Sequence, residues 1–139
     1  MRKEIVAILG AGIIGMSQPA FCSEFIGDFC WGISDMLEIG SWKLGISHMG
    51  GGHYQVNGMI YKSENRVELI SGNLEIHDNK ILMNTTQSQN EDGNHFETGI
   101  AYWDLSLETM SGTVNGMFHE EGGSGQIHEK YQVIPVTCP

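Results

Sequence analysis

The chain is poor in basic residues and in cysteine, and each shortage excludes a class of protein. Its 139 residues include 7 lysines and arginines against 17 aspartates and glutamates, which gives a formal net charge of −10. Nucleic acid and anionic lipid both require a cationic surface, so neither is an expected partner. The three cysteines contain no Cys-x-x-Cys pair, which excludes a zinc ribbon and a thioredoxin-type motif.

Helical periodicity and common catalytic motifs are also missing. From residue 24 onward no apolar stripe has the 3.6-residue period of a helix. The chain has no Gly-x-Ser-x-Gly motif, and no glycine-rich phosphate loop precedes a helix. The sequence therefore points to no cofactor, and it favours a protein that is not an enzyme.

The N-terminus has the features of a signal peptide. Arg2 and Lys3 precede an uncharged apolar run, residues 5–16, which ends at Ser17. A dozen apolar residues are too few to span a bilayer, which takes about 20 in a helix. We therefore predict a signal peptide over residues 1–22, a single domain over residues 23–139, and a secreted or periplasmic location. Cleavage after Ala20 and lipidation of Cys22 are the alternatives.

Cleavage after Cys22 would leave an even number of cysteines, Cys30 and Cys138. Exported proteins meet an oxidising environment, so these two are predicted to form a disulfide. Such a bond would close a loop of about 100 residues and stabilise the fold by about 4–5 kcal/mol. Cleavage after Ala20 would leave three cysteines instead.

The dominant pattern beyond residue 24 is a period of two residues, interrupted by Gly, Asn, Asp and Ser, which is typical of β-strands and turns. Gly72 lies inside the longest predicted strand and suggests a bend or bulge there. Eight strands are predicted, over residues 25–33, 42–49, 53–61, 66–77, 80–88, 96–107, 112–120 and 126–136.

Short turns leave no room for crossover helices, so consecutive strands should pair in an antiparallel manner. An all-β chain of eight such strands is predicted to close into an up-and-down barrel, whose interior holds side chains or one small ligand. A Cys30–Cys138 disulfide supports closure, because it would join the first strand to the last. The alternative is a β-sandwich of the same strands.

Gly40-Ser41-Trp42 opens an alternating strand and resembles the Gly-x-Trp signature of the calycin-type barrels, the lipocalins and avidin-like proteins. The resemblance implies a small-ligand barrel in which Trp42 closes one end. The chain departs from the family pattern, because its Gly-x-Trp strand is the second one and no helix follows the barrel. The resemblance implies an architecture and a role for Trp42, but no particular ligand.

Five residues are candidates for binding a ligand. By alternation, Glu120 and Glu129 share the apolar faces of adjacent strands, where two carboxylates can raise one another's pKa or bind a cation. His48 shares a face with Trp42, and Tyr54 and Tyr102 belong to the aromatic side chains that would fill a barrel.

The histidines do not predict a metal site. His48 and His53 flank one glycine-rich turn, and His119 and His128 flank another. In an up-and-down order these two turns lie at opposite ends of the barrel. A zinc ion needs about four ligands around one point, so none is expected.

Three functions stay open at this level. The first is the binding of a small apolar or cationic molecule at one barrel mouth. The second is a barrel filled by side chains that binds or inhibits another protein through its surface. The third is an enzyme that uses Glu120 and Glu129. Stable membrane insertion is not expected, because Lys43, Glu68 and Glu97 are assigned to outward faces. The sequence does not predict an oligomeric state.

Overall fold

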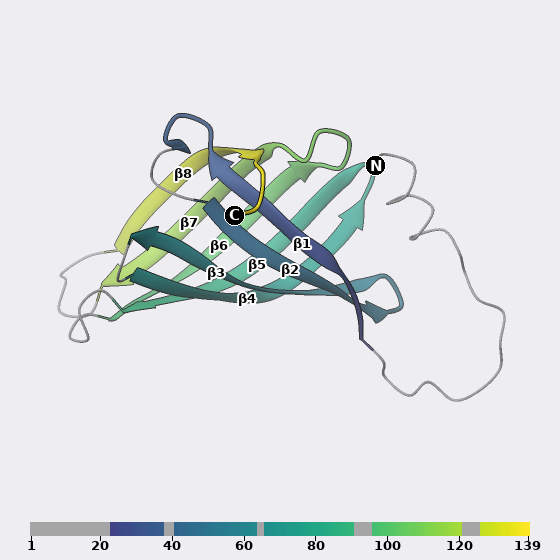
Figure 1. Cartoon of the computed structure of the whole chain (residues 1–139), viewed down its shortest axis with the longest axis horizontal. Coiled ribbons are helices and arrows are strands. Elements are labelled where there is room, and N and C mark those ends of the chain that lie inside the picture. The colour runs from purple at the N-terminus through teal and green to yellow at the C-terminus, as the bar shows by residue number, and fades with distance from the viewer. Residues whose placement is uncertain (1–22, 38–40, 64–65, 91–95, 121–125) are drawn as a thin grey trace, which may run out of the picture.

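The computed structural model describes residues 23–37, 41–63, 66–90, 96–120 and 126–139, which form an all-β, antiparallel fold (Figure 1). The predicted signal peptide lies outside the described residues. All eight predicted strands are present, and their bounds differ from the predicted ones by at most two residues. They are β1 (Glu24–Ile33), β2 (Ser41–Gly50), β3 (His53–Ser63), β4 (Arg66–His77), β5 (Lys80–Asn90), β6 (Phe96–Ser106), β7 (Gly112–Glu120) and β8 (Gln126–Pro135).

In the described part of the chain, no helix has the length and apolar character needed to span a bilayer.

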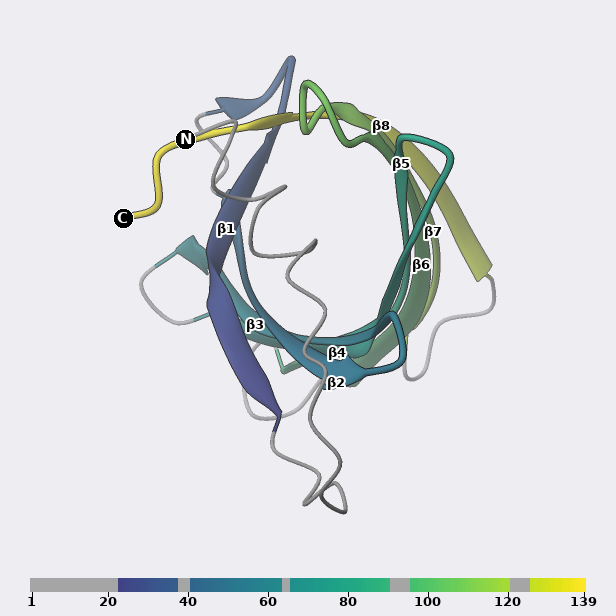
Figure 2. The same ribbon diagram turned by 90° about the vertical axis from the view of Figure 1, so that its right-hand side faces the viewer.

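The strands form one closed up-and-down barrel, as predicted, and not the alternative sandwich. Each strand pairs with the next along the chain, and β1 pairs with β8 to complete the ring (Figure 2). This closing contact is short, since it consists of three residue pairs that begin at Trp31–Pro135 and end at Ile33–Val133. Strands in a closed barrel are tilted and staggered, so β1 and β8 overlap only near their C-terminal ends.

The predicted disulfide reinforces this short contact. Cys30 and Cys138 are bonded, with their Cα atoms 5.2 Å apart and 108 residues between them along the chain. Beside the bond, the amide of Val136 donates a hydrogen bond of 2.9 Å to the carbonyl of Cys30. The C-terminal segment is therefore fastened across β1, beyond the last strand pair.

The turns follow their local sequence. Asp78 and Asn79 have φ angles of 45° and 65°, which the two-residue hairpin turn between β4 and β5 requires and which Asp and Asn tolerate. The β2–β3 turn uses three successive glycines, residues 50–52, all with positive φ. These residues make the turn possible because glycine adopts such angles without a steric penalty.

The bend or bulge predicted at Gly72 is wrong. β4 pairs without a register shift with both of its neighbours at this position. A Cβ atom on Gly72 would instead collide with the carbonyl oxygen of Asn84 on β5. The glycine is needed for close contact between two strands rather than for a bend in one of them.

Tryptophan fills the middle of the barrel. Trp31 and Trp103 are fully buried, and Trp42 is 9% exposed. The rings of Trp31 and Trp42 meet the Trp103 ring edge-on, with centroids 6.0 Å and 5.4 Å away. The indole of Trp31 donates a 2.7 Å hydrogen bond to the carbonyl of Met110, in the β6–β7 connection. This connection therefore packs against the core from the end of the barrel that also carries the β2–β3 turn.

Candidate functional site

The inner face of the barrel changes from apolar to polar along its length. On β5, the buried side chains run in the order Ile81, Met83, Thr85 and Gln87. The same change occurs on two other strands toward the end that carries the β7–β8 connection: Leu74, Ile70 and Glu68 on β4, and Trp103, Ala101 and Glu97 on β6. On β8 the inward residues Val133, Tyr131 and Glu129 are followed by Ile127, which is apolar and 47% exposed at the same end.

We call this end the polar mouth and define it by the inward side chains of Glu68, Gln87, Glu97, Glu129, Tyr131 and Phe118.

Two residues of the polar mouth lie on the inner face, although the sequence predicted them on the outer face. Glu68 is 3% exposed and alternates with buried Ile70 and Leu74, so its assignment to the outer face is wrong. Glu97 shares the face of Ala101 and was also wrongly placed outward. The reason is that β4 and β6 carry apolar residues at both alternating positions, which leaves the inward face undetermined by the pattern alone. Both carboxylates also have interaction partners within the protein.

A partly buried tyrosine and a carboxylate meet at the edge of the polar mouth. The Tyr131 hydroxyl donates a hydrogen bond to the carboxylate of Glu129, two residues earlier on β8. Burial, followed by the hydrogen bond and the charge of Glu129, raises the pKa of Tyr131 to about 12. Glu129 is half-buried and Tyr131 packs against the core. The carboxylate is thus held in a defined position while part of it faces solvent.

Phe118 covers two glycines in the inner face of the polar mouth. It pairs with Gly99 on β6 and lies two residues beyond Gly116 on its own strand. A Cβ atom on either glycine would collide with the ring. The ring can therefore pack directly on the backbone, as aromatic residues do beside glycine in designed sheets. Phe118 remains half-exposed, so part of its ring faces the mouth.

The structure distributes the five candidate ligand residues among three places. Glu129 lies in the polar mouth, and Glu120 ends β7 with its main chain paired to Glu97, although its side chain lies outside the described atoms. His48 and Tyr54 pair at the opposite end, where their ring centroids are 5.1 Å apart and burial raises the pKa of Tyr54. Tyr102 points outward and is 41% exposed.

The histidines lie as predicted, with the β2–β3 turn and the β7–β8 connection at opposite ends of the barrel. Within the described ranges, no three His, Cys, Asp or Glu side chains come together in a way that could hold a metal ion.

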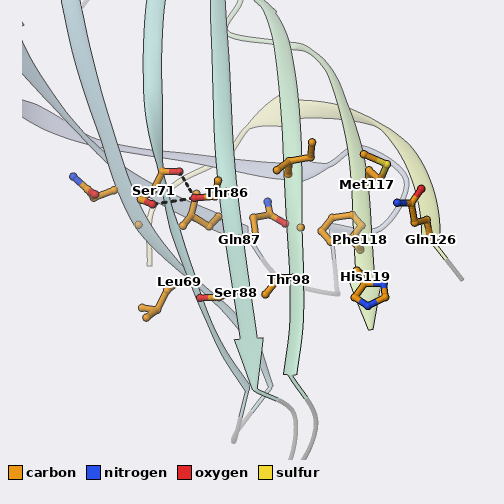
Figure 3. Close-up of a pocket in the computed structure, with 15 residues that line it drawn as sticks. Leu69, Ser71, Thr86, Gln87, Ser88, Thr98, Met117, Phe118, His119 and Gln126 are labelled. Carbon is orange, nitrogen blue, oxygen red and sulfur yellow. Dashed lines mark hydrogen bonds between the residues drawn. The ribbon is translucent and has the colours of Figure 1, made fainter. Parts of the chain in front are cut away.

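A hollow region on the outside of the barrel was not anticipated from the sequence. Two adjoining grooves of about 850 Å³ and about 970 Å³ run across the outer face of β3–β8. They share Ser71, Thr86, Ile100 and Met117, which are neighbours on four consecutive strands. Figure 3 shows the first groove, with Leu69, Ser88, Thr98 and His119 in a parallel row. We use the name outer wall for all outward side chains that line either groove.

Comparison with known proteins does not assign the chain to a family: no family model matches it, and no curated protein or solved structure is significantly similar. The resemblance to calycin-type barrels stays a prediction. What the geometry defines is a class of structure, an eight-stranded closed barrel with a tryptophan core and one polar mouth.

Proposed function

We propose that this protein binds a small cationic molecule at its polar mouth. The observation that carries the proposal is that inward side chains on β4, β5 and β6 change from apolar to polar or acidic toward the same end, where β8 adds the carboxylate of Glu129. The polar side chains at this end of the barrel could bind a polar ligand, which a uniformly apolar interior could not do.

The chemistry of the mouth suits an organic cation such as an amine. The carboxylate of Glu129 is an acceptor and a counter-charge, and the half-exposed ring of Phe118 offers an aromatic face. A cation over an aromatic face is attracted by about 0.5–2 kcal/mol, and a hydrogen bond to a charged group contributes about 1.5–3 kcal/mol. The net charge of −10 would also concentrate cations near the protein.

The size of the ligand is limited by the core. Trp31 and Trp103 are fully buried in the middle of the barrel, so the ligand would occupy the mouth and not the full length of the interior. Small amines and quaternary ammonium compounds fit this limit better than long apolar chains.

The first experiment is native mass spectrometry of the exported protein purified from its own host, followed by calorimetric titration with choline and putrescine. We expect binding of an amine and at least tenfold weaker binding by Glu129→Gln and Phe118→Leu. The matched control is Glu75→Gln, which removes the same charge from an exposed outward position. Failure of both probes to bind, or an equal loss from Glu75→Gln, would show that the mouth is not the site.

A further inference from the structure

One tryptophan of the core cluster has no hydrogen-bond acceptor for its indole N–H. The indole of Trp31 donates to the carbonyl of Met110 at 2.7 Å. The indole of Trp103 donates to the hydroxyl of Thr85 at 3.0 Å. Trp42 belongs to the same cluster and is 9% exposed, but its buried Nε1 atom has no acceptor among the described residues. The same packing therefore satisfies two indoles and leaves the third unpaired.

An unpaired N–H inside a protein calls for an explanation, because the great majority of buried polar groups have a hydrogen-bond partner. Burial removes the bond to water, and the free energy of that bond is lost unless another acceptor replaces it. The Trp103 ring, whose centroid is 5.4 Å from that of Trp42 and whose plane is nearly perpendicular, offers at most a weak N–H–π contact. A phenylalanine would fill the core at this position without the cost. The N–H of Trp42 is explained by an acceptor that the folded chain itself does not supply.

Trp42 shares a row of inward positions with the polar mouth. The strand register runs from Trp42 through Ile60 to Glu68, so Trp42 on β2 and Glu68 on β4 lie in one row. The row continues through Gln89 to Glu97 on β6. Trp42 is also the first inward residue of β2, at the barrel end that carries the mouth. Its indole therefore lies where the tryptophan core meets the polar mouth.

We propose that the molecule bound at the polar mouth carries a hydrogen-bond acceptor in addition to its cationic group, and that the indole N–H of Trp42 donates to this acceptor. The inference rests on the proposed function and narrows the ligand class to amines that also hold a hydroxyl, ether or carbonyl oxygen. Glu129 then pairs with the cation and Trp42 with the oxygen. An indole N–H only donates, so an ammonium group cannot replace the oxygen. A plain diamine such as putrescine leaves the N–H of Trp42 unpaired.

A pair of matched ligands tests the inference on the exported, disulfide-bonded protein. Choline and propyltrimethylammonium have the same charge and nearly the same shape, but the second has a methyl group in place of the hydroxyl. We expect calorimetric titration to show about tenfold tighter binding of choline by the wild type, because only choline pairs the buried donor.

Trp42→Phe removes the N–H, keeps an aromatic ring in the core and should bind the two ligands with equal affinity. The matched control is Trp31→Phe, which removes an N–H that already has an acceptor in Met110 and should keep the preference for choline.

Nuclear magnetic resonance of the indole N–H groups gives a second readout on the wild-type protein. Choline should shift the Trp42 signal, and the signals of Trp31 and Trp103 should move much less, because their hydrogen bonds stay within the protein. Dimethyl sulfoxide, an uncharged acceptor, should shift the same Trp42 signal at high concentration.

The outcomes separate this inference from the proposed function. Equal affinity of the wild type for choline and propyltrimethylammonium, an unmoved Trp42 signal when choline binds, or an equal loss of preference in Trp31→Phe would overturn the inference and leave the proposed function standing. If neither cation binds but dimethyl sulfoxide shifts the Trp42 signal, the proposed function fails and the acceptor site remains. If no probe shifts the Trp42 signal, the acceptor site is wrong.

Discussion

Removing the Cys30–Cys138 disulfide is expected to lower the free energy of unfolding by about 5 kcal/mol. In the chain-entropy treatment this value follows from the 108-residue separation of the two cysteines, because the bond restricts the unfolded chain most when the loop is long. The structure adds a local reason, since β1 and β8 share only three residue pairs. Single domains are stable by about 5–15 kcal/mol, so the loss is a large fraction of the total.

The test is urea unfolding of Cys138→Ser against the oxidised wild type. Cys30 is 4% exposed, and its thiol would remain in place as a small apolar group. We expect the melting temperature to fall by about 20 °C. Hydrogen exchange should show lost protection at the Val136 amide, which bonds to the carbonyl of Cys30.

Reduced wild type is the matched control, because it lacks the bond but keeps both sulfur atoms. Its stability should equal that of the variant. A loss below about 1 kcal/mol in both proteins, the ordinary effect of a single substitution, would refute the argument that the disulfide supplements a short strand contact.

Three further changes test the interior. Thr85→Val removes the acceptor of the 3.0 Å hydrogen bond from the buried indole of Trp103 and should cost about 1–3 kcal/mol in urea unfolding, whereas Thr86→Val on the outer face should cost much less. Gly72→Ala should destabilise by about 1–3 kcal/mol, because the new methyl group meets the backbone of β5. Tyr131→Phe should remove the ultraviolet titration step near pH 12. Because the folded pKa of Tyr131 lies above the ordinary value of 10, its stabilising effect is complete below pH 10 and is lost as the pH rises through 12. The wild type should therefore lose more stability over this range than the variant, in which Tyr54, whose pKa burial also raises, still titrates.

The strands and turns were predictable because their causes are local. Alternation along β5 groups Ile81, Met83, Thr85 and Gln87 on one face, and in the structure all four are buried. The turn at Asp78 and Asn79 follows from the backbone angles that these residue types tolerate. Closure was predicted from the number of strands and the absence of crossover helices, and the disulfide was predicted from the even number of cysteines that the proposed cleavage after Cys22 would leave.

The candidate site was less predictable wherever a strand carries apolar residues at both alternating positions. On β6, Tyr102 and Trp103 are adjacent, and only the barrel decides that Trp103 is fully buried while Tyr102 is exposed. On β4, Leu69 and Ile70 are likewise adjacent apolar residues, and only the barrel decides that Ile70 is buried while Leu69 is exposed. Because Glu68 lies on the same face as Ile70, it is buried too. The outer wall could have been found from the sequence by counting charges at outward positions, but only once the correct alternating face of each strand was known.

The sequence by itself determined an acidic, all-β chain of eight antiparallel strands and the cysteine pair that joins its ends. These properties depend on composition and on a two-residue period, which act over short distances. Only the tertiary structure decided which face of each strand is buried and which residues of different strands are neighbours. The polar mouth and the outer wall exist because the strand register aligns similar positions on several strands, and this register depends on which faces are buried together and on the turns that join the strands.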